Sequence, residues 1–95
     1  MPEMHFRLRW PDGRRQSVYS PSLVVKDFFV EGATYPLADF LGRSREALRI
    51  ASDRVKAKYG FACSRAAAAF AEIERSAAPF AAMPAACVTV EAFED

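Results

Sequence analysis

Cys63 is the residue whose position most strongly suggests covalent chemistry. It follows Gly60, which ends a predicted helix, and it stands where a second helix is expected to begin. A helix N-terminus favours the thiolate, the reactive form of cysteine. Tyr59, Arg65 or His5 are the candidate assisting groups, although no nucleophile–base pair is evident from their spacing. Cys63 is therefore either a nucleophile or a small apolar side chain packed beneath the helix start.

A metal site is a weaker hypothesis. The two cysteines, Cys63 and Cys87, and the single histidine, His5, are widely separated in the sequence. None belongs to a short ligand pair of the Cys-x-x-Cys kind. We therefore expect neither a metal ion nor a cofactor.

Basic side chains are concentrated in residues 43–58, where six basic residues stand against two acidic ones. Arg45, Arg49 and Arg54 of this stretch, together with Tyr59, are candidate binding residues for phosphate, carboxylate or nucleic acid. The alternative is an ordinary solvated helix face. The net charge of the whole chain is only +1, and the sequence holds no glycine-rich phosphate loop and no aromatic RNA-binding motif. We therefore do not expect nucleic acid as a partner.

A second basic group is predicted on a sheet. The alternation of residues 4–10 places Arg7 and Arg9 on the outward face of a strand, with Arg14 and Arg15 across a hairpin. Like charges on neighbouring strands repel each other. The acidic tail of this chain or of another one would relieve the repulsion, which makes Arg7 and Arg9 candidate contacts to a protein partner. The tail residues are Glu91, Glu94 and Asp95.

The strands are predicted from alternation and turn residues. Residues 4–10 alternate apolar and polar, Pro11-Asp12-Gly13 forms a turn, and residues 14–19 return as a second strand. Residues 88–93 alternate again and are expected to pair beside the first strand. Residues 31–34 are expected to be a loop, and residues 22–29 are either one or two helical turns or extended.

Two helices are predicted between the second and third strands. Tyr35-Pro36 is expected to open a long helix that ends at Tyr59, because apolar residues recur at helical spacing up to the stop residue Gly60. Gly42 inside it indicates a close crossing or a break. Cys63 or Ser64 should cap a second, alanine-rich helix that runs to Ser76 and approaches its neighbour closely. The fold class is α+β, a two-layer sandwich of a three-stranded antiparallel sheet, β-β-α-α-β in order, packed on two helices.

Length and composition bound the rest. Ninety-five residues form a single domain, 1–95, whose core depends on eight Phe, three Tyr and one Trp. A core this thin is open to completion by a second copy, so a homodimer is one candidate assembly. No apolar run approaches the roughly 20 residues of a membrane helix, and the N-terminus lacks the apolar region of a secretory signal. We expect a cytoplasmic protein without membrane contact.

Four segments together resemble a known bacterial family. They are residues 1–13, Tyr19–Ser22, Tyr35–Leu37 and residues 51–64, of which the run Arg54–Ser64 is the most distinctive. Over residues 1 to about 75 the chain is similar to the mycobacterial-type nitrogen-starvation-response proteins; segment 77–86 is the least similar. The resemblance implies a gene cluster with a nitrilase-type hydrolase, a radical-SAM protein and an acetyltransferase, and it implies no catalytic residue.

We therefore expect a non-catalytic accessory protein that interacts with enzymes of nitrogen starvation and nitrile assimilation. Two alternatives remain open. One is a small cysteine-dependent enzyme or carrier that uses Cys63, and the other is a sensor of an anionic nitrogen metabolite that binds to the basic helix.

Overall fold

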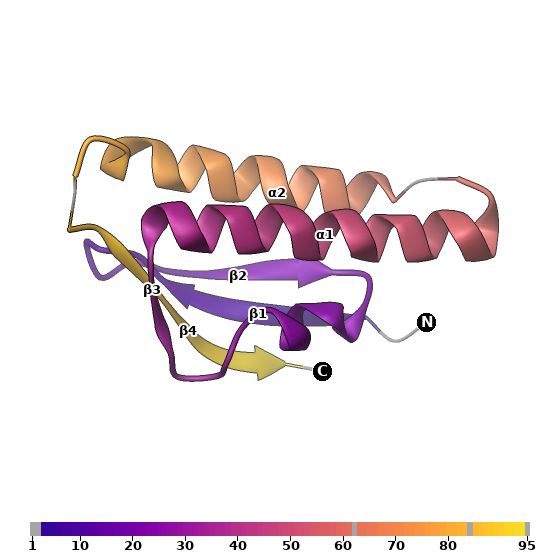
Figure 1. Ribbon diagram of the computed structural model, residues 1–95, viewed down its shortest axis with the longest axis horizontal. Coiled ribbons are helices and arrows are strands. Elements are labelled where there is room, and N and C mark those ends of the chain that lie inside the picture. Colours follow the sequence, from indigo (N-terminus) through magenta and orange to yellow (C-terminus); the bar gives the residue numbers. More distant parts are fainter. Residues whose placement is uncertain (1–2, 62, 84, 95) are drawn as a thin grey trace.

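Two helices lie over one face of an antiparallel sheet (Figure 1). The computed structural model describes residues 3–61, 63–83 and 85–94. The elements in chain order are β1 (Met4–Arg9), β2 (Arg15–Ser20), the 3-10 helix η1 (Leu23–Asp27), β3 (Thr34–Pro36), α1 (Leu37–Tyr59), α2 (Ser64–Ala77), the 3-10 turn η2 (Ala78–Phe80) and β4 (Cys87–Glu94). The strand order is β2-β1-β4-β3. The predicted α+β class is thus confirmed.

Within the described residues the sheet has four strands, so the prediction of three is wrong. The missed strand is β3, which pairs antiparallel with β4 through Thr34–Thr89, Tyr35–Val88 and Pro36–Cys87. The two threonine hydroxyls lie 2.9 Å apart in a hydrogen bond. The helix therefore begins at Leu37, with Pro36 as its N-cap rather than a residue of its first turn.

The predicted hairpin is present. The inner face of β1 is fully buried at Phe6 and Leu8, and β2 pairs with it antiparallel. Gly13 in the turn has φ +90°, a left-handed conformation that glycine adopts without steric cost. On the other side β1 pairs with β4, as expected, with a register shift between Arg7 and Leu8.

Helix α1 is continuous, so neither predicted role of Gly42 holds. A Cβ atom built at Gly42 would meet no atom within 4 Å. The helix ends at Gly60, where φ is +86° and the N–H donates to the carbonyl of Lys56 at 2.8 Å, as the sequence predicts. Between β2 and β3 the chain takes the helical alternative, because the hydroxyl of Ser22 accepts a bond from the N–H of Val24 and caps η1.

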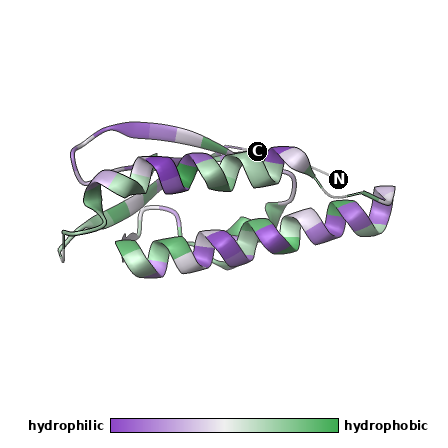
Figure 2. Cartoon of the chain, turned by 90° about the horizontal axis from the view of Figure 1, so that it is seen from above, coloured by the Kyte–Doolittle hydropathy of each residue, from purple (hydrophilic) through white to green (hydrophobic). Residues whose placement is uncertain are grey.

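The core lies between the helical layer and the sheet. Trp10, directly after β1, stacks on Phe80 at 6.3 Å and meets Phe40 of α1 edge-on at 5.8 Å. Helix α2 contributes Ala66, Ala69, Ile73 and Ala77. Coloured by hydropathy, α1 is hydrophobic at its start and more hydrophilic over its second half (Figure 2).

Candidate functional site

The structure places Cys63 where the sequence predicted it, at the N-cap of α2. Its side chain is half-buried and makes no capping bond, while its backbone N–H donates to Oγ of Ser52 in α1 at 3.3 Å. Both cysteines are free thiols. The location is confirmed, and the reactivity of Cys63 stays a prediction.

Two of the three candidate assistants of Cys63 gather around Tyr19 of β2. The guanidinium of Arg65 lies 3.8 Å from the ring centroid of Tyr19, and His5 meets this ring edge-on at 5.7 Å. The phenol donates to Oε2 of Glu3 at 3.1 Å. Partial burial raises the pKa of Tyr19, and the bond to Glu3 raises it further. The third candidate, Tyr59, is the last residue of α1 and is not part of this group around Tyr19.

The basic residues of α1 do not form one cluster. Arg49 is held in place by its own helix: it pairs with Glu46 and, at 2.9 Å, with Asp53. The hydrogen bond from Arg49 lowers the pKa of Glu46. Two carboxylates of the same helix therefore already compensate the positive charge of Arg49, which makes it less available to an external anion.

The other two predicted arginines of α1 have different neighbours. Arg45 lies 5.6 Å from the ring centroid of Phe70 and shares with Arg49 a shallow hollow of about 280 Å³ between the helices. Arg54 donates to Oγ of Ser22 at 3.1 Å and so fastens α1 to the cap of η1. Anion binding by these residues stays a prediction.

The exposed sheet face carries the predicted basic group and its acidic counterpart. Arg7 pairs with Glu94 at 3.0 Å, and Arg15 with Glu91 at 3.1 Å. Arg9 lies opposite Arg15 in the register, and Asp95 lies outside the described residues. The acidic tail of the same chain therefore compensates the charges of Arg7 and Arg15, and a protein contact at this face stays a prediction.

The C-terminal end of α1 and the start of the following loop project beyond the sheet (Figure 1). Twenty-three helical residues span about 35 Å, whereas the six residues of β1 span about 20 Å. We call residues 56–61 the helical tip. All six are exposed, and Tyr59 and Phe61 keep 52% and 68% of their surface accessible. Lys56 and Lys58 make the tip positive, and the ammonium of Lys58 lies 5.6 Å from the ring centroid of Tyr59.

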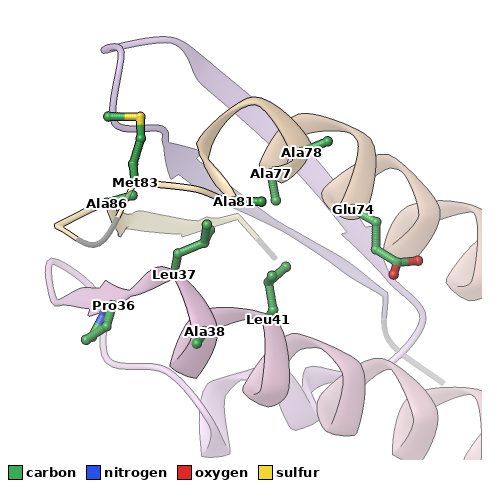
Figure 3. A pocket seen from close by; sticks show the side chains of 10 residues that line it. All are labelled: Pro36, Leu37, Ala38, Leu41, Glu74, Ala77, Ala78, Ala81, Met83 and Ala86. Carbon is green, nitrogen blue, oxygen red and sulfur yellow. The ribbon is translucent and has the colours of Figure 1, made fainter.

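An apolar groove of about 440 Å³ opens between the start of α1 and the end of α2 (Figure 3). Leu37 and Leu41 form one wall, and a row of alanines from α2 and the turn after it forms the other. Met83, 51% exposed, closes one end. Among the described residues that line the groove, Glu74 is the only charged one.

Sequence reasoning missed both the groove and the aromatic character of the tip. An alanine-rich helix predicts close packing against its neighbour, but the same small residues leave space where the two helices diverge. Phe61 comes directly after Gly60, the residue that ends α1. A hydrophobic side chain at this position commonly packs back onto the helix, so the sequence does not indicate that Phe61 is exposed.

Two further searches cover only the described residues, 3–61, 63–83 and 85–94. Within them no three His, Cys, Asp or Glu side chains come together as metal ligands. No described helix has both the length and the apolar character needed to span a bilayer.

These features define a class: a small α+β domain whose helical layer has an apolar groove at one end and a basic, aromatic tip at the other. The chain belongs to the family of the nitrogen starvation-induced protein NitG, whose family model matches residues 5–93. No curated protein and no solved structure matches it. The expected resemblance to nitrogen-starvation proteins is thus confirmed at the level of the family.

Proposed function

We propose that this protein is a non-catalytic interaction protein of the nitrogen-starvation response, and that the helical tip is its docking surface. Membership of the NitG family supports the setting. The observation that carries the docking role is the joint exposure of Tyr59 and Phe61 at a projecting, positively charged end of α1. The proposed partner is an enzyme of nitrogen assimilation, encoded in the same gene cluster, with an acidic surface around an apolar hollow.

The chemistry of the tip suits such a contact. Aromatic side chains are enriched among the residues that dominate binding energy, because they bury a large area with few rotatable bonds. A single exposed apolar residue is ordinary on a protein surface, but here two exposed aromatic residues are separated only by Gly60 at a projecting corner. Lys56 and Lys58 would accelerate association with an acidic partner, and this effect would weaken with added salt.

The test is a pull-down from nitrogen-starved cells with the wild-type chain and matched variants. Phe61→Ser removes an aromatic side chain that is 68% exposed, and Val30→Ser removes an aliphatic one that is 67% exposed in the loop before β3. We expect the first variant to lose a specific partner enzyme, with affinity lowered on the order of 30-fold as for an interface hot spot. The second should retain it. Recovery of the same proteins by both variants, or of no enzyme by the wild type, would exclude this function.

A cysteine-dependent enzyme or carrier is the second candidate. The observation in its favour is the half-buried thiol of Cys63 at the N-cap of α2, where the side chain makes no capping bond. Alkylation of the folded Cys87→Ser variant measures Cys63 alone, and the Cys63→Ser variant gives the rate of the exposed Cys87. This candidate expects Cys63 to react faster than Cys87 in spite of its lower exposure. Reaction of Cys63 only after denaturation would eliminate it.

A further inference from the structure

We propose that the apolar groove between α1 and α2 binds a protonated aliphatic amine, with the alkyl chain between the helices and the ammonium group at Glu74. This site is independent of the helical tip, because it uses the opposite ends of the two helices. A ligand pocket in a protein is usually a concave, mostly apolar space of 300–1,000 Å³ with a small number of polar groups. The groove, at about 440 Å³ with a single carboxylate, fits this description.

The groove exists because of the sizes of the facing side chains. Leu37 and Leu41 extend from α1, and the residues opposite them are Ala77, Ala78 and Ala81 (Figure 3). Alanine methyl groups are too short to fill the space between helices that separate at this end. An alkyl chain would contact methyl and methylene groups on both walls, and the flexible side chain of Met83 can adjust to its length.

The charges around the groove select a cation. Glu74 lies in the last turn of α2, where the helix dipole adds partial negative charge. The structure gives its carboxylate no ion pair or hydrogen bond with another described residue. The positive end of the α1 dipole is also near, but Asp39 occupies the first turn of α1 and offsets it. Arg43 pairs with Asp39 at 2.9 Å, and the same guanidinium donates to the carbonyl of Phe28 at 2.9 Å.

The experiment compares three ligands of equal chain length, hexylamine, hexanoate and 1-hexanol, on the full chain. Alanine and methionine methyl groups labelled with ¹³C report binding by NMR at Ala77, Ala81 and Met83. We expect hexylamine to shift these signals and to bind about two- to fivefold more tightly than hexanol, the range of an exposed ion pair. Hexanoate should bind more weakly than hexanol. Equal or tighter binding of hexanoate, or no shift at these methyl groups with hexylamine, would overturn the proposal.

Three variants separate charge from volume. Glu74→Gln should remove the preference for hexylamine over hexanol, while Glu72→Gln, two residues earlier on the same helix, should preserve it. Ala81→Leu fills the groove and should abolish binding of both ligands. The thermal unfolding of each variant checks that it is folded. If Ala81→Leu binds as the wild type does, or if sedimentation shows the groove closed between two copies of the chain, the proposal is wrong.

Discussion

Ser44 offers a direct test of the packing between α1 and the sheet. It is fully buried in α1, and its hydroxyl oxygen has no hydrogen-bond partner. A buried, unsatisfied polar group costs about 1–3 kcal/mol. Ser44→Ala removes this cost and gains about 0.5 kcal/mol of helix propensity, while the lost oxygen leaves a void smaller than a methyl group, which costs under about 1 kcal/mol. The net expectation is a stabilisation of about 1–2 kcal/mol.

The assay is unfolding by urea, followed by the fluorescence of the single tryptophan. Trp10 is buried against Phe40 and Phe80, so its emission reports on the same core. A gain of this size should also raise Tm by about 4–15 °C in a domain of this length. Ser76→Ala is the control, because the hydroxyl of Ser76 donates to Gln16 at 2.8 Å and its loss should be neutral or destabilising.

A destabilisation of Ser44→Ala by more than about 1 kcal/mol, the value of a typical hydrogen bond, would refute this reasoning. It would mean that the hydroxyl bonds in solution, most simply to the carbonyl of Phe40 one turn earlier, as buried helical serines often do. An equal response of Ser44→Ala and Ser76→Ala would show that helix propensity alone governs both sites.

Three further changes have defined outcomes. Gly42→Ala should stabilise the protein by up to about 1 kcal/mol, because the added methyl group meets no neighbour; calorimetry measures this. Gly60→Ala should destabilise it by about 1–2 kcal/mol, since φ there is +86°; a gain in urea midpoint would contradict this. The raised pKa of Tyr19 means that the folded state holds this proton more tightly than the unfolded state, so the stabilisation is complete below about pH 10 and is lost as the pH rises through the folded-state value. Ultraviolet titration against Tyr19→Phe locates this ionisation, and Glu3→Gln should move it downward.

Elements with a strong local pattern were predictable from the sequence. The alternation of β1 and the helical spacing of α1 each reflect one buried face, and Gly60 marks the helix end by its own conformational freedom. Strand β3 is different, because three residues carry too little periodicity, and their extended form depends on pairing with β4. One local signal was available: a residue before proline favours extended backbone, and Tyr35 precedes Pro36.

The candidate sites were predictable only where they depend on neighbours in sequence. The position of Cys63 at a helix start follows from the preceding glycine. The ion pair between Arg7 and Glu94 joins residues from the two ends of the chain. The sequence predicts an acidic partner for Arg7, but it does not distinguish the tail of the same chain from that of another chain. The groove depends on the angle at which two helices separate, and composition does not encode that angle.

The short third strand has a consequence for self-association. Pro36 has no N–H to offer, and it sits at the open border of the sheet immediately before α1. A fifth strand added at this edge would pair with only three residues, one of which has no N–H to donate. Growth of fibres by strand addition is thereby discouraged at the β3 edge of the sheet.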